Sequence, residues 1–179
     1  MRKLRIIFGL LAVAFISFVV GEWKSLAANA QDSSAPRGTP APARIMTPVE
    51  RVNSTPKGQL KNPYTDYAGI ADEGHQVFLK YGCNGCHGGG GGGGMCPPLT
   101  SDTWFYGRDD DTLFRLVTLG SLALQKQGYS RMTQQEVGPM PPFGPTIKTD
   151  DELWKIIAWI RAVNPNSLKP ATVYPPWPG

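Results

Sequence analysis

Cysteine is scarce in this chain of 179 residues, which has three, and histidine occurs only twice. Disulfide-stapled scaffolds are dense in cysteine and use it in pairs, so three cysteines exclude that class. Charged residues are also few, at 18%, whereas 41% of the residues are hydrophobic and 10% aromatic, enough for a modest core. Length and composition leave one ordinary domain with tails, and they exclude a coiled coil or a large multidomain enzyme.

The first thirty residues have the pattern of a secretory signal. Arg2, Lys3 and Arg5 precede an apolar stretch over residues 6–20, and Ala28-Asn29-Ala30 forms an A-x-A cleavage site before Gln31. A transmembrane anchor is the alternative, but fifteen residues of helix reach roughly 22 Å, short of a bilayer core of about 30 Å. We therefore expect residues 1–30 to be a signal peptide and the mature protein to be periplasmic, with no membrane insertion after cleavage.

The excess of basic residues belongs mostly to this signal. The full chain has a net charge of +4, and loss of residues 1–30 lowers it to +1. A nucleic-acid-binding protein needs a concentrated basic face, which interspersed charges do not provide. We therefore expect no nucleic-acid partner.

Proline-rich segments flank the central part of the chain. Residues 31–63 are rich in Pro, Ala and Ser without a helical or alternating apolar period, which predicts an extended N-terminal arm, either a spacer or a docking tail. Residues 166–179 predict a C-terminal arm with the aromatic residues Tyr174 and Trp177. The domain itself is predicted over residues 64–165.

Three helical patterns within this domain predict an all-α fold with long loops. The first begins at Asp72 and stops at Gly82, the second follows Asp109-Asp110-Asp111 and stops at Gly120, and the third runs from the cap Thr149 to Asn164-Pro165. Gly74 lies inside the first helix, where glycine costs roughly 1 kcal/mol, and this favours a close crossing with the third helix near Trp159. The aspartates at 109–111 are expected either to cap the second helix or to steer a basic partner.

Cys83-Asn84-Gly85-Cys86-His87 is a C-x-x-C-H motif, the attachment site of a c-type haem. Its two thiols add to the porphyrin vinyl groups, and the adjoining histidine reaches the iron from the proximal side. A thioredoxin-type dithiol would need a βαβ context that the sequence lacks. A zinc site would need four ligands, and only Cys96 and His75 remain to complete one. The motif predicts one covalently bound haem c, whose apolar surface would also complete a thin core.

The sixth iron ligand distinguishes an electron carrier from an enzyme with an open iron. Met140 is our first candidate because prolines on both sides fix its backbone in the loop Gly138–Gly144. Met132, in a polar stretch, is the second candidate, and Met95 the third. His75 is a weak candidate, and a surface or core histidine is the better interpretation.

Seven glycines, Gly88 to Gly94, follow the motif directly. No Lys-Ser/Thr follows in register, so a nucleotide-binding loop is excluded. Two interpretations stay open: a backbone that passes close to the haem or a partner, and a flexible insertion. Cys96 is interpreted as a small buried residue.

The chain resembles the cytochrome c-L family, the electron acceptors of periplasmic PQQ-dependent methanol dehydrogenases, over roughly residues 60–165. The motifs that carry the resemblance are the following: Gly82-Cys83-Asn84-Gly85-Cys86-His87, the glycine run, Met95-Cys96-Pro97-Pro98-Leu99, Asp102-Thr103-Trp104, Tyr106-Gly107, Asp109-Asp110-Asp111-Thr112-Leu113-Phe114-Arg115, Gly138-Pro139-Met140-Pro141-Pro142 and Asp151-Glu152-Leu153-Trp154-Lys155-Ile156-Ile157.

This resemblance implies a class I cytochrome c fold in which Cys83 and Cys86 carry the haem and His87 is the proximal ligand. Members that serve calcium enzymes can bind iron through a histidine three residues after the loop methionine, whereas this chain has Phe143 there. The departure implies that Met140 is the sixth ligand and favours the branch that serves lanthanide-dependent enzymes. The disulfide that ties down the C-terminal arm in some members cannot form with Cys96 alone.

The function implied is electron transfer and not enzymatic catalysis. The donor would be a PQQ-dependent methanol dehydrogenase, the acceptor a downstream cytochrome c or oxidase, and the carrier a monomer. The alternatives are a generic periplasmic carrier for another quinoprotein or terminal oxidase, and an enzyme or gas-binding haem protein with an open iron site.

Overall fold

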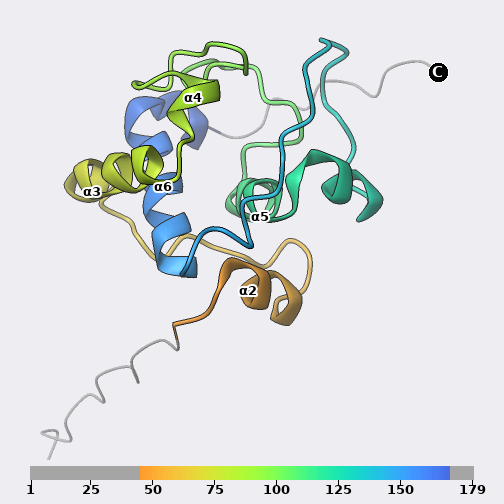
Figure 1. Cartoon of the computed structure of the whole chain (residues 1–179), viewed down its shortest axis with the longest axis horizontal. Coiled ribbons are helices and arrows are strands. Elements are labelled where there is room, and N and C mark those ends of the chain that lie inside the picture. Colours follow the sequence, from red (N-terminus) through yellow and green to blue (C-terminus); the bar gives the residue numbers. More distant parts are fainter. Residues whose placement is uncertain (1–44, 170–179) are drawn as a thin grey trace, which may run out of the picture. The chain divides into compact units, whose positions relative to one another are not determined.

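The computed structural model describes residues 45–169. This part of the chain contains no strand, and its helices are, in order, α2 (Pro48–Ser54), α3 (Tyr67–Lys80), α4 (Asn84–His87), α5 (Asp110–Lys126), α6 (Asp150–Val163) and the 3-10 helix η1 (Pro165–Leu168) (Figure 1). The all-α prediction is confirmed. The predicted signal peptide, residues 31–44 of the predicted N-terminal arm, and Tyr174 and Trp177 lie outside the described residues. No helix within residues 45–169 is long and apolar enough to cross a membrane.

Helices α3 and α6 cross closely at Gly74, as predicted. A Cβ atom at Gly74 would lie 2.1 Å from the backbone oxygen of Lys155 and 2.8 Å from the Cβ of Trp159, so no larger residue fits without movement. The rings of Phe78 and Trp159 pack beside this contact with centroids 4.4 Å apart. The missing side chain therefore lets the two helix backbones touch.

Helix α6 forms the centre of the core and begins where the sequence predicts. Thr149 and Glu152 make a reciprocal capping box, and acidic residues fill the first turn, where the helix dipole favours them. Its buried face packs against α3, α5 and η1 (Figure 1). The members of that face are Leu153, Trp154, Ile156, Ile157, Trp159 and Ile160.

Two helix boundaries differ from the prediction. Helix α3 begins at Tyr67 and not at Asp72, because Asp66 caps it by accepting a hydrogen bond from the Gly69 nitrogen at 2.9 Å. In α5 the first helical segment ends at Gly120, as predicted, but a second segment follows the kink and continues to Lys126. Gly120 has a φ of 73°, a left-handed conformation that breaks one turn of the helix.

The prediction of an extended arm over residues 31–63 is wrong for residues 48–54, which form α2. Thr47 and Glu50 make a capping box around Pro48, which occupies the first turn, where proline is tolerated. A helix of seven residues is too short to show a clear apolar period. It is attached to α6 by an ion pair between Arg51 and Asp150 with a nitrogen-oxygen distance of 2.6 Å.

The segment after α2 is held to α5 by a buried polar network. Arg115, 4% exposed, donates to the carbonyl oxygens of Thr55 at 2.6 Å and Pro56 at 3.1 Å. Its ion-pair partner Asp111 accepts hydrogen bonds from the Leu60 nitrogen at 3.1 Å and the Tyr129 hydroxyl at 2.5 Å. This network makes the chain up to Leu60 part of the folded domain.

Each of the three consecutive aspartates has a partner within the domain, although Asp109 is exposed and Asp111 alone is buried. Asp109 caps α5 by accepting from the Thr112 nitrogen at 2.9 Å, and Asp110 pairs with Arg161 at 2.7 Å. Asp111 is bound in the Arg115 network. These contacts favour the capping interpretation over steering of a partner.

Candidate haem site

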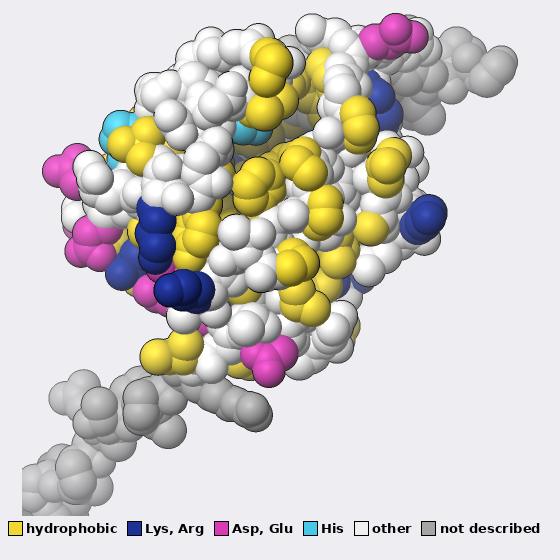
Figure 2. All heavy atoms as spheres, in the orientation of Figure 1, with side chains coloured by type: hydrophobic (Ala, Val, Ile, Leu, Met, Phe, Trp, Pro, Cys, Tyr) yellow, Lys and Arg dark blue, Asp and Glu magenta, His cyan; other side chains and the backbone are white. Residues whose placement is uncertain are grey.

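One cavity of about 280 Å³ opens on the face shown in Figure 2, where hydrophobic side chains and the backbone near α4 border the hollow. Its walls come from α3, α4, α5 and α6 and from the loops around residues 96–107 and 137–140. Most lining side chains are apolar, among them Phe78, Leu99, Leu113, Val117 and Ile157. Such a cavity suits a flat, largely apolar group.

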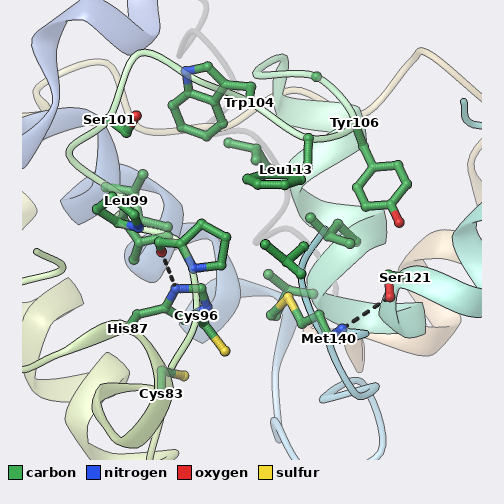
Figure 3. A pocket seen from close by; sticks show the side chains of 18 of the residues that line it. Cys83, His87, Cys96, Leu99, Ser101, Trp104, Tyr106, Leu113, Ser121 and Met140 are labelled. Atoms are coloured by element: carbon green, nitrogen blue, oxygen red, sulfur yellow. Dashed lines mark hydrogen bonds between the residues drawn. The ribbon is translucent and has the colours of Figure 1, made fainter. Parts of the chain in front are cut away.

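Cys83 and His87 lie on the same side of this cavity (Figure 3). The ring nitrogen Nδ1 of His87 is 2.9 Å from the carbonyl oxygen of Pro97. A carbonyl only accepts, so Nδ1 carries the proton and Nε2 keeps a free lone pair for a metal. Cys86 lies on the same short helix α4, half-buried and outside the cavity lining.

Cys96 is a lining residue that sequence reasoning assigned only to packing. It is half-buried, and its backbone nitrogen donates to the Cys86 carbonyl at 3.1 Å. Burial, together with a side-chain hydrogen bond in which the Cys96 thiol donates to Cys86, raises the pKa of the Cys96 thiol to about 11. Burial likewise raises the pKa of the unmodified Cys83 thiol to about 11. No sequence pattern indicates the contact between Cys96 and Cys86, because it depends on how the glycine run folds back.

Met140 lies across the cavity from His87, as Figure 3 shows. Its loop is attached to the bend in α5 by paired hydrogen bonds. The Ser121 nitrogen donates to the Met140 oxygen at 2.9 Å, and the Met140 nitrogen donates to the Ser121 Oγ at 3.0 Å. Further along, the Phe143 nitrogen donates to the Val117 oxygen at 2.9 Å and the Gly144 nitrogen to the Thr118 oxygen at 3.0 Å.

Gly120 makes this attachment possible. A Cβ atom there would lie 2.8 Å from both the Met140 oxygen and the Pro142 nitrogen. Only glycine adopts the positive φ and also allows this approach without strain. Gly120, predicted to end a helix, ends the first segment of α5 and also packs against the loop Gly138–Gly144.

The other candidate ligands lie outside the cavity lining. Met95 is 84% exposed and Met132 is 36% exposed. His75 stacks on Trp159 with ring centroids 4.8 Å apart, and its Nε2 is 2.6 Å from the Gly89 oxygen. The interpretation of His75 as a packing residue therefore agrees with its contacts. Among the candidates, Met140 is the one whose side chain lines the cavity with His87.

The residues present fit a haem. Haem iron can take a histidine nitrogen and a methionine sulfur as ligands, and His87 and Met140, which both line the cavity, could supply such a donor pair. The walls are apolar, as the porphyrin faces require. The lining residue Trp104 also has a buried Nε1 without a hydrogen-bond partner among the described residues. Buried donors are normally paired, so we expect this N–H to bind a polar group of the cofactor, such as a carboxylate.

Comparison with known proteins agrees with this geometry. The family described as "Cytochrome C oxidase, cbb3-type, subunit III" matches residues 69–160, more than half of the chain. The chain belongs to this cytochrome c family. The cytochrome has the class I cytochrome c fold, carries covalently bound haem c, and is an electron carrier.

Two solved structures are similar to this cytochrome. Cytochrome cL from Hyphomicrobium denitrificans is 28% identical, with a TM-score of 0.44, and the match covers 64% of this chain and 62% of that one. Cytochrome CL from the marine methylotrophic bacterium Methylophaga aminisulfidivorans MPT is 25% identical, with a TM-score of 0.43 and coverage of 74% and 72%. The cytochrome thus spans less than two thirds of the Hyphomicrobium protein. No curated protein matched it.

Proposed function

We propose that Cys83 and Cys86 attach the haem through thioether bonds and that His87 Nε2 and Met140 Sδ are its axial ligands. The observation that carries the proposal is the position of His87 and Met140 on opposite sides of one apolar cavity (Figure 3). The hydrogen bond from His87 to Pro97 fixes the ring and its tautomer. Two hydrogen bonds to Ser121 fix the Met140 backbone.

Bound in this way, the haem supplies a centre that accepts and returns one electron. The protein's own residues keep the site closed to other chemistry. With His87 and Met140 both bound to the iron, no protein-free position would remain for oxygen or a substrate, and apolar wall residues such as Leu113 and Val117 would exclude water. This arrangement favours the carrier over the enzyme or gas-binding alternative.

The electron donor we propose is a periplasmic PQQ-dependent methanol dehydrogenase. The support is the combination of motifs shared with the cytochrome c-L family, which extends far beyond the haem-binding pentapeptide. The reduced quinol of that enzyme holds two electrons and two protons, whereas this carrier takes one electron. Each quinol therefore reduces two carrier molecules, releases two protons and returns to the quinone. A downstream cytochrome c or an oxidase then takes the electron.

Phe143 supports a donor of the lanthanide-dependent type. The side chain packs partly buried against the core, and the nitrogen of the same residue donates to the Val117 oxygen at 2.9 Å. Phenylalanine has no atom that binds iron, so the position at which some calcium-type members place a histidine is inert here. The iron ligand is then the methionine three residues earlier.

Anaerobic stopped-flow reduction of the ferric holoprotein tests the donor. Calcium- and lanthanide-containing methanol dehydrogenases are each supplied with methanol, and the cytochrome concentration is varied. Fast, saturable reduction by the lanthanide enzyme is the expected result. If ascorbate reduces the protein and neither dehydrogenase does, the generic periplasmic carrier becomes the better account and the methanol-oxidation role is wrong.

A further inference from the structure

The glycine run over residues 88–94 is a defined loop. The Gly93 nitrogen donates to the His87 oxygen at 2.8 Å, and the Leu99 nitrogen donates to the Gly91 oxygen at 2.7 Å. His75 Nε2 lies 2.6 Å from the Gly89 oxygen while its ring stacks on Trp159. These hydrogen bonds favour a backbone with a fixed path over a flexible insertion.

Four of its glycines are required by the fold itself. Gly88, Gly91 and Gly93 have φ values of 76°, 74° and 96°, which other residues rarely adopt. A Cβ atom at Gly94 would lie 2.9 Å from the Cys86 oxygen, and one at Gly88 would lie 2.6 Å from the Gly93 oxygen. At these positions the loop's own path excludes a side chain.

The fold does not require glycine at the other three positions. Gly89, Gly90 and Gly92 have no left-handed φ, and a Cβ atom added at any of them would meet nothing within 4 Å. All three are exposed. Glycine in an exposed loop costs conformational entropy relative to alanine, so the fold of this molecule alone does not account for them. A surface free of side chains is useful when another molecule must approach the backbone closely.

The segment that contains the run has no charged side chain and has one large hydrophobic side chain that is exposed. Met95 follows the run directly and is 84% exposed, which is unusual for a large hydrophobic side chain. From Gly82 to Ser101 the sequence contains no Asp, Glu, Lys or Arg. In Figure 2 the surface above the hollow, in the region of α4, is largely the white of backbone and small residues.

We propose that Gly89, Gly90, Gly92 and Met95, here named the glycine platform, form the docking surface for the electron-donating dehydrogenase. The proposal rests on the proposed function. The platform is continuous with the proposed iron ligand, because the run begins one residue after His87. The Gly93 nitrogen donates to the His87 oxygen at 2.8 Å, so a donor in contact with this bare backbone would lie beside the segment that carries His87. Because the platform has no charge, its partner surface is an uncharged, apolar one, and contact there is little affected by salt.

The test adds bulk to the platform without disturbing the fold. Gly90→Trp and Gly92→Trp place a large side chain where nothing lies within 4 Å. Asn53→Trp is the matched control, because it adds the same side chain at an exposed position of α2, at the other end of the view from α4 in Figure 1. Met95→Glu adds a charge within the platform. Each holoprotein is reduced by the donor dehydrogenase and, separately, by ascorbate.

We expect the two glycine variants and Met95→Glu to lower the second-order rate constant with the dehydrogenase by about tenfold or more. Ascorbate reduction, haem content and reduction potential should match the wild type, and Asn53→Trp should behave as wild type in every assay. Increasing salt should change the wild-type rate only weakly.

The outcomes separate the two proposals. If the dehydrogenase does not reduce the wild type at all, the donor assignment of the preceding section is wrong. If it reduces the wild type and both tryptophan variants equally fast, the glycine platform is not the docking surface. If sedimentation shows that the wild type self-associates and Gly90→Trp abolishes this, the platform is an interface between copies of the chain and the docking proposal is overturned.

Discussion

Ser121 and Met140 exchange two hydrogen bonds, one from the Ser121 nitrogen to the Met140 oxygen at 2.9 Å and one from the Met140 nitrogen to the Ser121 Oγ at 3.0 Å. In a straight helix the Ser121 nitrogen would donate to the Val117 oxygen. The bend at Gly120 removes that bond, and the Val117 oxygen accepts from the Phe143 nitrogen instead. Hydrogen bonds to the loop Gly138–Gly144 therefore replace those of one helical turn, and the position of Met140 depends on the bend.

Gly120→Ala should release Met140 from its position. The new Cβ would lie 2.8 Å from the Met140 oxygen, at a φ that alanine does not favour. We expect the ferric holoprotein to lose its methionine-to-iron charge-transfer band and to bind cyanide readily. Ser121→Ala, which removes one side-chain hydrogen bond and keeps the backbone bond, should keep the band and lose about 1 kcal/mol of stability. An intact band in Gly120→Ala would show that Met140 is not held through this bend.

Gly74→Leu tests the crossing of α3 and α6. Even a Cβ atom would approach the Lys155 oxygen to 2.1 Å, so the helices must separate to admit a leucine. Overpacking of this kind costs roughly 1–3 kcal/mol, and we expect a lower melting temperature with reduced haem incorporation. Gly90→Ala, which meets nothing within 4 Å, is the control for a glycine replacement in itself. Equal melting temperatures for Gly74→Leu and wild type would exclude the close crossing.

The sequence predicted those features whose cause is local. The capping box at Thr149, the apolar face of α6 and the C-x-x-C-H motif each lie within one short segment, so spacing alone predicts them. The Gly74 crossing was also predictable. A glycine inside a helix lowers the stability of the helix, and close packing of the two helices offsets that loss. Met140 was favoured among the methionines because the prolines around it restrict its loop.

The features that the sequence did not predict depend on contacts between distant segments. Helix α2 has seven residues, too few to show an apolar period in the sequence. Its attachment depends on the ion pair between Arg51 and Asp150. The continuation of α5 past Gly120 follows from the loop that packs on it, twenty residues later. Cys96 meets Cys86 only because the glycine run turns back. In each case the partner lies far along the chain, and periodicity carries no information about it.

Asp111 should make stability depend on pH at acidic values. Burial alone would raise the pKa of Asp111, but hydrogen bonds from Tyr129, Gly58, Leu60 and Arg115 outweigh it and lower the pKa below its ordinary value. A carboxyl with a lowered pKa in the folded state stabilises the protein above its unfolded pKa of about 3.9. That stabilisation is lost as the pH falls below about 4, through the folded pKa.

Asp111→Asn measures this contribution. It leaves Arg115, whose side chain is 5% exposed, without its buried charge partner, and we expect a loss of about 3 kcal/mol at neutral pH. Urea unfolding between neutral pH and about pH 2 should show a shallower acid dependence in the variant than in the wild type. Asp72→Asn, at an exposed position of α3, controls for the change in net charge. Parallel acid profiles for wild type and Asp111→Asn would contradict the lowered pKa.

Trp104 tests how the cavity accommodates the polar part of its cofactor. Its Nε1 is buried and has no partner among the described residues, and an unpaired buried donor costs about 1–3 kcal/mol. If a carboxylate of the haem accepts this N–H, Trp104→Phe removes a charge-assisted hydrogen bond and destabilises the holoprotein by roughly 1.5–3 kcal/mol. The reduction potential should then shift as well, because the carboxylate charge near the iron is less well compensated. If instead nothing accepts the N–H, the same variant removes an unsatisfied donor and is as stable as the wild type or more so. Thermal unfolding and redox titration of the holoprotein distinguish the two cases, and we expect the first, since a buried donor that lines a cofactor cavity is normally paired once the cofactor is bound.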